Sequence, residues 1–381
     1  MAAMNGSAAS FHGHGRLLGC YTALALMLAA FVLAPVTANA QEPKTSTYLA
    51  LGDSISFGYS EERFNNHFPT DSPSYFEEGV ANDFVKLLGK SSEIGKEIRL
   101  VNDACPGETS NGLIGENPAL GGETSTESIE EVEGKPAEDF PAGGYQGLGD
   151  WHPCKYTFVN HLPLHNGGYF EGAKEVSQLE EALASIASTK SPVKAITLNI
   201  GSNDELAAIA QCKNEVILEF TKTGKSKYGA TIEGAVIACI TETSKNVTVP
   251  HILKNIGDIL GVIDGSGYTG PIVLMGFYNP DTFILPGSDT LQKATNEAVE
   301  ADILPAFKSN VTFANPFPVF NKDSGTNATK EKEAICKYTE MCNPNDPGGE
   351  KDEGDIHPTV KGYKELAKLV NAAYLANPAT P

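Results

Sequence analysis

Positive charge is scarce in this sequence of 381 residues. It contains 28 Lys and Arg residues against 48 Asp and Glu residues, which gives a formal net charge of −20 at pH 7. A surface of this sign repels nucleic-acid phosphates and anionic membranes, so we expect no nucleic-acid partner.

Several motifs that mark common enzyme classes are also missing. The chain has no Gly-x-Ser-x-Gly, which excludes the nucleophile turn of the α/β-hydrolases, and no His-Glu-x-x-His, which excludes a common zinc-hydrolase site. It has no Cys-x-x-Cys and no histidine spaced as a partner for its cysteines, so no zinc site is expected. After residue 40 there is no apolar run of about eighteen residues, so we expect no membrane span in the mature chain.

Residues 1–40 differ from the rest of the chain. Arg16 is their only charged side chain, an apolar run follows it, and Ala38-Asn39-Ala40 ends the segment. This order is typical of a secretory signal peptide. An uncleaved membrane anchor is the alternative, but Pro35 and the small-residue end favour cleavage. We therefore expect a secreted protein whose mature domain covers residues 41–381.

Six of the seven cysteines follow the expected signal peptide, at positions 105, 154, 212, 239, 336 and 342. An even number of cysteines in an exported chain predicts disulfides, with buried free thiols as the alternative. If neighbours along the chain pair, the disulfides close the loops 105–154, 212–239 and 336–342, although other connectivities are possible.

Short apolar segments rich in β-branched residues alternate with amphipathic segments. We predict buried parallel strands over residues 47–51, 98–101, 193–200 and 271–277, and a weaker one over residues 311–314. Helical patterns cover residues 83–88, 174–187, 204–220, 292–307 and 360–375. This alternation predicts an α/β fold with a central parallel sheet covered on both faces, in which ligands bind beyond the carboxyl ends of the strands.

Two polar, glycine-rich regions interrupt the alternation. Residues 107–172 predict an irregular insertion, whose aromatic residues either pack or line a substrate site. Residues 321–354 lead into the last motif. Neither region predicts an independent domain.

Ser54 and His357 are the candidate nucleophile and base. Ser54 lies in Gly52-Asp53-Ser54 at the end of the first predicted strand, where a strand-to-helix turn points its hydroxyl into the cleft. His357 lies in Asp355-Ile356-His357-Pro358, with Pro358 expected in the first turn of the last helix, and it can accept the Ser54 proton. Taken alone, the first motif also suits an ordinary capped turn, and a lone histidine near a helix start is more often a surface residue.

Gly107 and Asn203 are candidate hydrogen-bond donors. Gly107 follows Cys105-Pro106 after the second strand, and its N–H can approach a substrate oxygen with no side chain intervening. Asn203 follows the third strand, and its amide can donate into the same cleft. A Pro-Gly turn and a helix-capping Asn-Asp pair are the alternatives. Because these positions converge on one edge of the sheet, they predict an oxyanion hole of Ser54 N–H, Gly107 N–H and the Asn203 amide.

With these four segments in this order, the chain resembles the SGNH hydrolase superfamily, also called GDSL esterases and lipases, in its exported bacterial branch. The resemblance extends over nearly all of residues 47–375. It implies a flavodoxin-like three-layer α/β/α sandwich and hydrolysis of esters without a cofactor. It also implies catalytic or oxyanion-hole roles for Ser54, Gly107, Asn203 and His357.

One position departs from the family pattern, which has an acid three residues before the histidine. Gly354 occupies that place, and Asp355 stands two residues before His357. Either Asp355 orients the imidazole through a shifted turn, or a backbone carbonyl holds the Nδ1 proton. Asp355 is the candidate third catalytic residue, and the ester-hydrolase hypothesis does not depend on it because orienting the ring is a secondary role.

The sequence leaves the substrate open. The leading hypothesis is an esterase or lipase that forms an acyl-enzyme on Ser54 and acts on a small-molecule, lipid or carbohydrate ester. A carbohydrate (acetyl) esterase or phospholipase of the same fold, or a catalytically silent surface-binding module, are the alternatives.

Overall fold

The computed structural model describes residues 45–67, 76–90, 98–114, 177–282, 288–343 and 354–380. The expected signal peptide, and residues 115–172 of the expected insertion with their aromatic side chains, lie outside the described residues.

A sheet of five parallel strands forms the centre of the fold, in the order β2-β1-β3-β4-β5. The strands are β1 (Ser46–Gly52), β2 (Ile98–Asn102), β3 (Val193–Asn199), β4 (Ile272–Met275) and β5 (Val311–Ala314). All five predicted strands are present, and this strand order is that of flavodoxin-like folds. The predicted α/β fold class is therefore confirmed.

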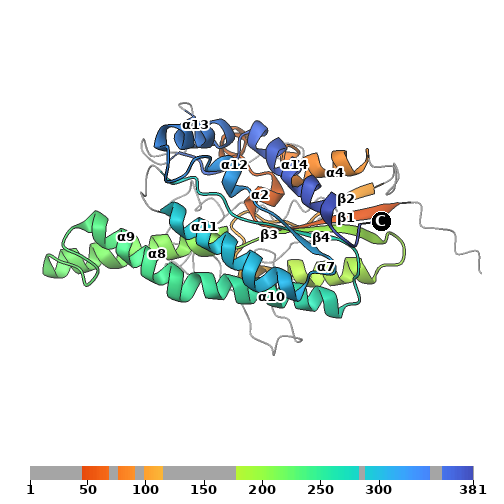
Figure 1. Ribbon diagram of the computed structural model, residues 1–381, viewed down its shortest axis with the longest axis horizontal. Helices are drawn as coiled ribbons and strands as arrows, with labels where there is room; N and C mark the ends of the chain where they lie inside the picture. Colours follow the sequence, from red (N-terminus) through yellow and green to blue (C-terminus); the bar gives the residue numbers. More distant parts are fainter. Residues whose placement is uncertain are drawn as a thin grey trace, which may run out of the picture. The chain divides into compact units, whose positions relative to one another are not determined.

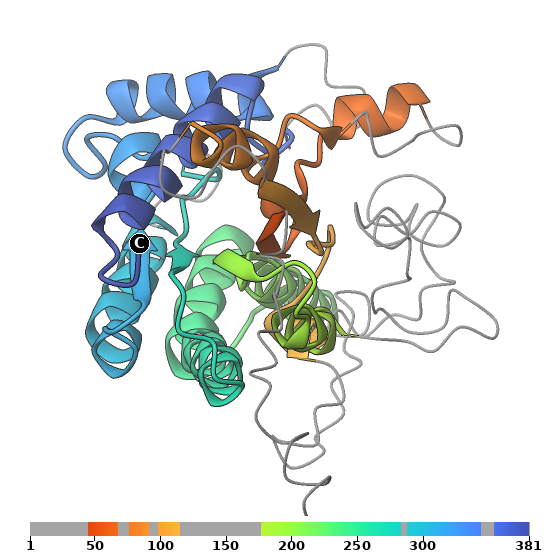
Figure 2. The same ribbon diagram turned by 90° about the vertical axis from the view of Figure 1, so that its right-hand side faces the viewer.

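Helices cover both faces of the sheet (Figures 1 and 2). One layer contains α5 (Ser110–Ile114), α7 (Gln178–Ala187) and α10 (Val249–Gly265). The other contains α2 (Ser54–Phe57), α4 (Val80–Leu88), α12 (Phe317–Phe320), α13 (Ala328–Tyr338) and α14 (Val360–Ala376). Of the described helices, none combines the length and the apolar composition needed to cross a membrane.

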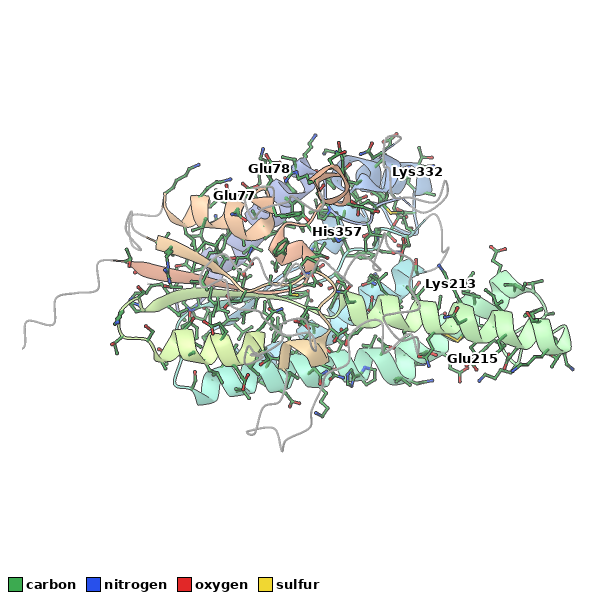
Figure 3. All side chains as sticks on the ribbon, turned by 180° about the vertical axis from the view of Figure 1, so that it is seen from behind. Glu77, Glu78, Lys213, Glu215, Lys332 and His357 are labelled. Carbon is green, nitrogen blue, oxygen red and sulfur yellow. A yellow bond between two sulfur atoms is a disulfide. The ribbon has the colours of Figure 1, made fainter. Side chains whose placement is uncertain are left out.

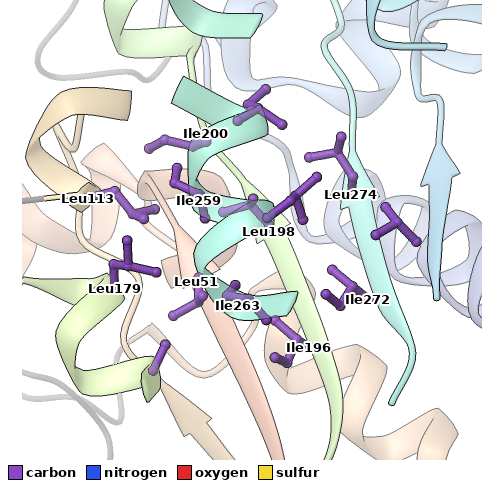
Figure 4. Close-up of a cluster of buried hydrophobic side chains, with 14 of the residues drawn as sticks. Leu51, Leu113, Leu179, Ile196, Leu198, Ile200, Ile259, Ile263, Ile272 and Leu274 are labelled. Carbon is purple, nitrogen blue, oxygen red and sulfur yellow. The ribbon is translucent and has the colours of Figure 1, made fainter. Parts of the chain in front are cut away.

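The alternation of side chains along each strand assigns them to two hydrophobic cores. Leu49 and Leu51 of β1 pack with α7 and α10, whereas Tyr48 and Ala50 pack with α4 and α14. Figure 4 shows part of the first core, where Leu51 and the strand β3 meet the isoleucines of α10. Because both faces are buried, the strands read as continuous apolar runs.

Most predicted helices are present with shifted ends. The pattern over 83–88 belongs to α4, that over 204–220 to α8 (Ser202–Thr223), and that over 360–375 to α14. The pattern over 174–187 corresponds to α7, of which residues 178–187 are described as helix. The pattern over 292–307 is divided into α11 (Ser288–Ala298), a π-helical turn η7 (Val299–Ile303) and a short 3₁₀ turn η8 (Leu304–Ala306).

Three longer helices were not predicted from the sequence, namely α9 (Ile232–Thr243), α10 and α13, the last of which lies inside the polar region 321–354. Several shorter helical turns were also not predicted, namely α3 (Glu61–His67), α5, α12, η6 (Ser244–Thr248) and η9 (Glu340–Cys342). In α9 the apolar and β-branched residues go nearly all round the helix, so no amphipathic period is visible. In α10, Pro250 and two interior glycines weaken the helical signal, although Pro250 fits the first turn.

Helices α8 and α9 lie side by side and extend away from the sheet (Figure 1). The disulfide Cys212–Cys239 joins them, and a second disulfide, Cys336–Cys342, closes a short loop after α13. These two predicted pairings are confirmed. Cys105 is also disulfide-bonded, whereas Cys154, its predicted partner, lies outside the described residues.

Candidate active site

Ser54 follows β1 directly and is the first residue of α2. Asp53 caps this short helix, because its Oδ1 accepts the N–H of Ile55 at 2.9 Å. Gly52 has a φ of 138°, and a Cβ at this position would lie 2.0 Å from the carbonyl oxygen of Asn199. The tight turn that presents Ser54 therefore requires glycine at position 52.

The structure brings the two candidate catalytic residues most distant in sequence into contact. The Nε2 atom of His357 lies 2.9 Å from the Oγ of Ser54, and its Nδ1 lies 2.5 Å from Oδ1 of Asp355. The same Oδ1 accepts the backbone N–H of His357 at 2.9 Å, which fixes the short turn between the two residues. A carboxylate, an imidazole and a hydroxyl thus form one hydrogen-bonded line with 8% or less of each residue exposed.

The loop that carries His357 is held by the segment that follows α13. The N–H of Glu340 donates to the His357 carbonyl at 2.9 Å, and the N–H of Thr359 donates to the Tyr338 carbonyl at 2.9 Å. Thr359 is the N-cap of α14, which begins at Val360. The expectation that Pro358 lies in the first helical turn is therefore wrong, because Pro358 precedes the cap and pairs with Thr339 in an isolated β-bridge.

Gly354 is explained by a close approach of two backbones. A Cβ at this position would lie 2.3 Å from the carbonyl oxygen of Met341. No acidic side chain fits three residues before His357, and the carboxylate comes instead from Asp355.

The electrostatics of this line favour an imidazolium beside a carboxylate. Burial alone would lower the pKa of His357, but the charge and hydrogen bond of Asp355 outweigh it and raise that pKa above its ordinary value. Burial alone would likewise raise the pKa of Asp355, but the interactions with His357 lower it. The pair therefore stabilises positive charge on the ring.

Gly107 follows β2 and Asn203 follows β3, the two strands that neighbour β1, so both lie beyond the same edge of the sheet as Ser54. The Asn203 side chain donates through Nδ2 to the carbonyl oxygen of Glu108 at 2.8 Å. It thereby fixes the loop that carries Gly107, whose φ is 80°. Asn203 lines a cavity together with Ser54, whereas Gly107 is buried and is not among the described residues that line it.

The side chain of Gln178, which no sequence motif predicted as part of the site, holds the turn that carries Ser54. The side-chain amide of Gln178, at the start of α7, accepts from the Gly52 N–H and donates to the Gly52 carbonyl, both at 2.8 Å. The same Nε2 donates to the Glu108 carboxyl at 3.1 Å. Gln178 therefore links the turn of Ser54 to the loop of Gly107, and no motif in the sequence marks it.

Carboxyl groups buried around the site have raised pKa values. Burial raises the pKa of Asp53 to about 7 and that of Glu108 to about 8. Burial also raises the pKa of Glu205, on α8, to about 7. Among the described residues, no group of three His, Cys, Asp or Glu is arranged to hold a metal ion.

Two tyrosines that the sequence analysis did not select flank the His357 loop. The ring of Tyr59 lies 4.7 Å from the His357 ring, centroid to centroid. The hydroxyl of Tyr278 donates to the Ile356 carbonyl at 2.9 Å.

Figure 3 labels His357 close to the sheet, and Lys213 and Glu215 on the outer part of α8, away from it.

A cavity of about 610 Å³ opens at Ser54. Its described lining residues come mainly from α8, α9 and α11 and from the loop after β4. This volume lies within the range of small-molecule sites.

No family model and no curated protein matches this sequence. Solved structures similar to this chain include the lipase Lip_vut3 from a goat rumen metagenome (15% identity, TM-score 0.40, covering 86% of this chain and 97% of that one). They also include a member of the lipolytic G-D-S-L family from Veillonella parvula (12%, 0.38, 87% and 99%) and the acetylxylan esterase Axe2 from Geobacillus stearothermophilus (13%, 0.38, 87% and 96%). The structural neighbours of this chain are thus esterases and lipases of low sequence identity.

Proposed function

We propose that this protein is a serine hydrolase that cleaves carboxylic esters through an acyl-enzyme on Ser54. The observation that carries the proposal is the hydrogen-bonded line from Ser54 Oγ through His357 to Asp355, with distances of 2.9 and 2.5 Å. A nucleophile in contact with a base, and a base in contact with a third group that orients it, is the minimal arrangement for acyl transfer.

In the first half of the reaction, His357 Nε2 takes the proton of the Ser54 hydroxyl while Oγ attacks the ester carbonyl carbon. The tetrahedral intermediate then collapses, and His357 returns the proton to the departing alcohol. In the second half, His357 takes a proton from water as the water attacks the acyl carbon, and it returns this proton to Ser54 Oγ when the bond to the acyl group breaks and the carboxylic acid leaves. Asp355 holds the Nδ1 proton and stabilises the imidazolium that forms in each half.

The oxyanion of each intermediate needs donors on the side of Ser54 opposite His357. The Ser54 and Gly107 N–H groups and the Asn203 amide are our candidates. An amide nitrogen carries two N–H groups, so Asn203 can bond Glu108 with one of them and a substrate oxygen with the other.

We also propose that the protein is exported, with residues 1–40 as a cleaved signal peptide. The charged start, apolar middle and Ala-x-Ala end support cleavage after Ala40. The disulfides Cys212–Cys239 and Cys336–Cys342 fit an oxidising compartment.

Hydrolysis of p-nitrophenyl acetate and butyrate by the purified mature chain tests the activity, with Ser54→Ala measured beside the wild type. We expect measurable turnover that falls by about 10⁴-fold or more in the variant. If a folded wild type cleaves no ester, or if Ser54→Ala retains its activity, the proposal is wrong, and a binding module with this fold becomes the better hypothesis.

A further inference from the structure

The cavity beside Ser54 has a polar end and an apolar interior. Ser54, Asn199 and Asn203 line the end near the candidate nucleophile. Farther along, the walls consist of aliphatic side chains from four helices, namely Leu206, Ile209, Ile237, Ile240, Val249 and Leu291. Exposed polar residues, Thr241 and Lys245, stand where α9 passes into η6. Further polar residues of the lining, Asn279, Asp281, Ser288 and Thr290, belong to the loop after β4 and to the start of α11. A mostly apolar lining with a small number of polar groups is typical of a small-molecule site.

Among the described residues, two acids line the cavity, namely Glu205 on α8 and Asp281 in the loop after β4, and Glu205 does not give the interior a free charge. Glu205 is 2% exposed, and its carboxyl accepts from the Thr295 hydroxyl at 3.3 Å and from the Gln292 amide. Because its hydrogen bonds are made to α11, Glu205 closes the wall between α8 and α11 instead of presenting a charge to a ligand.

Helix α8 gives the cavity a direction. Asn203, Leu206 and Ile209 all line it, and they follow one another at intervals of three residues along one face of the helix. With a rise of 1.5 Å per residue, Ile209 lies about 9 Å farther from the start of the helix than Asn203. The disulfide Cys212–Cys239 fixes α9 against α8 just beyond this stretch, so the far wall is held in place.

The position of His357 tells which part of an ester fits this cavity. The departing alcohol must lie within reach of His357 Nε2, because that atom returns the proton. His357 itself is not among the described residues that line the cavity, whereas Ser54, Asn203 and Ile356, the neighbour of His357, are. The cavity is assigned to the acyl substituent because the imidazole that serves the departing alcohol lies outside its lining, and the series of alcohols below tests the opposite assignment.

We propose that this cavity is an acyl-chain site, which makes the protein selective for esters of medium-chain fatty acids over acetates, with Leu206 and Ile209 as the residues that limit chain length. The proposal rests on the ester-hydrolase function proposed above. Each methylene group that enters the apolar interior raises kcat/KM by roughly fourfold until the cavity is full.

The test compares p-nitrophenyl acetate, butyrate, octanoate and palmitate, which share one leaving group, for the wild type, Leu206→Trp and Ile209→Trp. We expect the wild type to prefer octanoate to acetate. Leu206→Trp should lower kcat/KM for octanoate by at least about tenfold and leave acetate within about twofold. Ile209→Trp should act at greater chain length, because its side chain lies farther along the cavity.

Ile217→Trp is the matched control. Ile217 is on the same helix, is 51% exposed and is not among the cavity-lining residues, so this variant should keep the wild-type chain-length profile. A second series of acetates with longer alcohols should show no preference for chain length, since the cavity takes the acyl side.

Three results would overturn the inference. The first is an unchanged octanoate-to-acetate ratio in both cavity variants, and the second is a shift confined to the alcohol series. If the tryptophan variants do not fold, Leu206→Ala and Ile209→Ala replace them, and we expect these variants to prefer longer acyl chains than the wild type. An unchanged preferred chain length in the alanine variants is the third contradicting result. If ester hydrolysis still depends on Ser54 in these cases, the proposed ester-hydrolase function is unaffected. If the wild type hydrolyses no ester, both the ester-hydrolase function and the acyl-chain site are wrong.

Discussion

Asp355 reaches the imidazole of His357 although it stands one position later than the acid of the family pattern. The turn between them is closed by the Asp355 carboxylate itself, which accepts both the backbone N–H and the Nδ1 proton of His357. A second bond from the Glu61 N–H to Oδ2, at 3.3 Å, holds the other oxygen. The alternative in which a backbone carbonyl orients the ring is therefore not needed to explain the geometry.

The acid limb of the pH profile should report this contact. His357 must be neutral to act as a base, and Asp355 raises its pKa, so kcat/KM should fall as the pH drops through a value above the ordinary 6.5. Asp355→Asn removes the charge that raises the pKa, so the limb should move to lower pH while the plateau falls by roughly 10²- to 10⁴-fold. A limb that stays in place in Asp355→Asn would contradict this assignment.

Asn203→Ala tests the oxyanion donor. We expect kcat for p-nitrophenyl butyrate to fall by roughly 10²- to 10³-fold with a smaller change in KM, because the donor acts mainly in the transition state. Asn377→Ala is the control. Asn377 is also buried, and its side-chain amide donates to the carbonyls of Ile272 and Asn310 at 3.2 and 2.8 Å. These carbonyls lie at the starts of β4 and β5, whereas Ser54 follows the end of β1. The control should lose stability and keep kcat; equal losses of kcat would contradict a specific role of Asn203.

At the scale of the elements, the two disulfides should affect different properties. Cys336–Cys342 closes the loop that donates to the His357 carbonyl, whereas Cys212–Cys239 joins the helices of the cavity wall. Replacing both cysteines of the first pair by Ser should lower kcat for acetate about ten- to hundredfold, through misplacement of His357, and stability by about 2 kcal/mol.

The second pair provides the comparison. Its larger loop predicts a loss of about 3.5 kcal/mol on Cys212→Ser/Cys239→Ser, with kcat for acetate nearly unchanged. Thermal unfolding and steady-state kinetics of the two double variants measure both effects. If kcat for acetate falls in proportion to the loss of stability in both double variants, the loop after α13 does not position His357.

The strands and the four motifs were predictable because local composition determines them. A run such as residues 193–200 is mostly apolar and is followed by Gly201 whatever it packs against. The cavity walls were not predictable, since Ile237 and Ile240 lie on α9, a helix without an apolar stripe, and they face Leu206 only through the fold. Gln178 was missed for the same reason: its contact with Gly52 joins residues 126 positions apart.

For the molecule as a whole, the buried acids predict how stability depends on pH. In the folded chain the pKa values of Asp53, Glu108 and Glu205 are raised to about 7, 8 and 7, above ordinary values near 4. Between about pH 4 and 8 the folded state thus binds more protons than the unfolded state, and stability must fall as the pH rises. We expect a higher Tm at pH 5.5 than at pH 8.

Glu108→Gln should flatten this dependence. The amide replaces a carboxyl that must stay protonated when buried, and its oxygen can still accept from Gln178. Differential scanning calorimetry at several pH values measures the slope. A Tm that rises from pH 5.5 to pH 8 in the wild type would contradict the pKa shifts of these buried acids.

Covalent labelling measures directly whether Ser54 is a nucleophile that His357 activates. The mature protein is incubated with an alkyl fluorophosphonate, and the adduct is located by peptide mass spectrometry in the wild type, Ser54→Ala and His357→Ala. We expect one adduct per chain on Ser54, none in Ser54→Ala and much slower labelling of His357→Ala. An adduct on another residue, or equally fast labelling of His357→Ala, would contradict it.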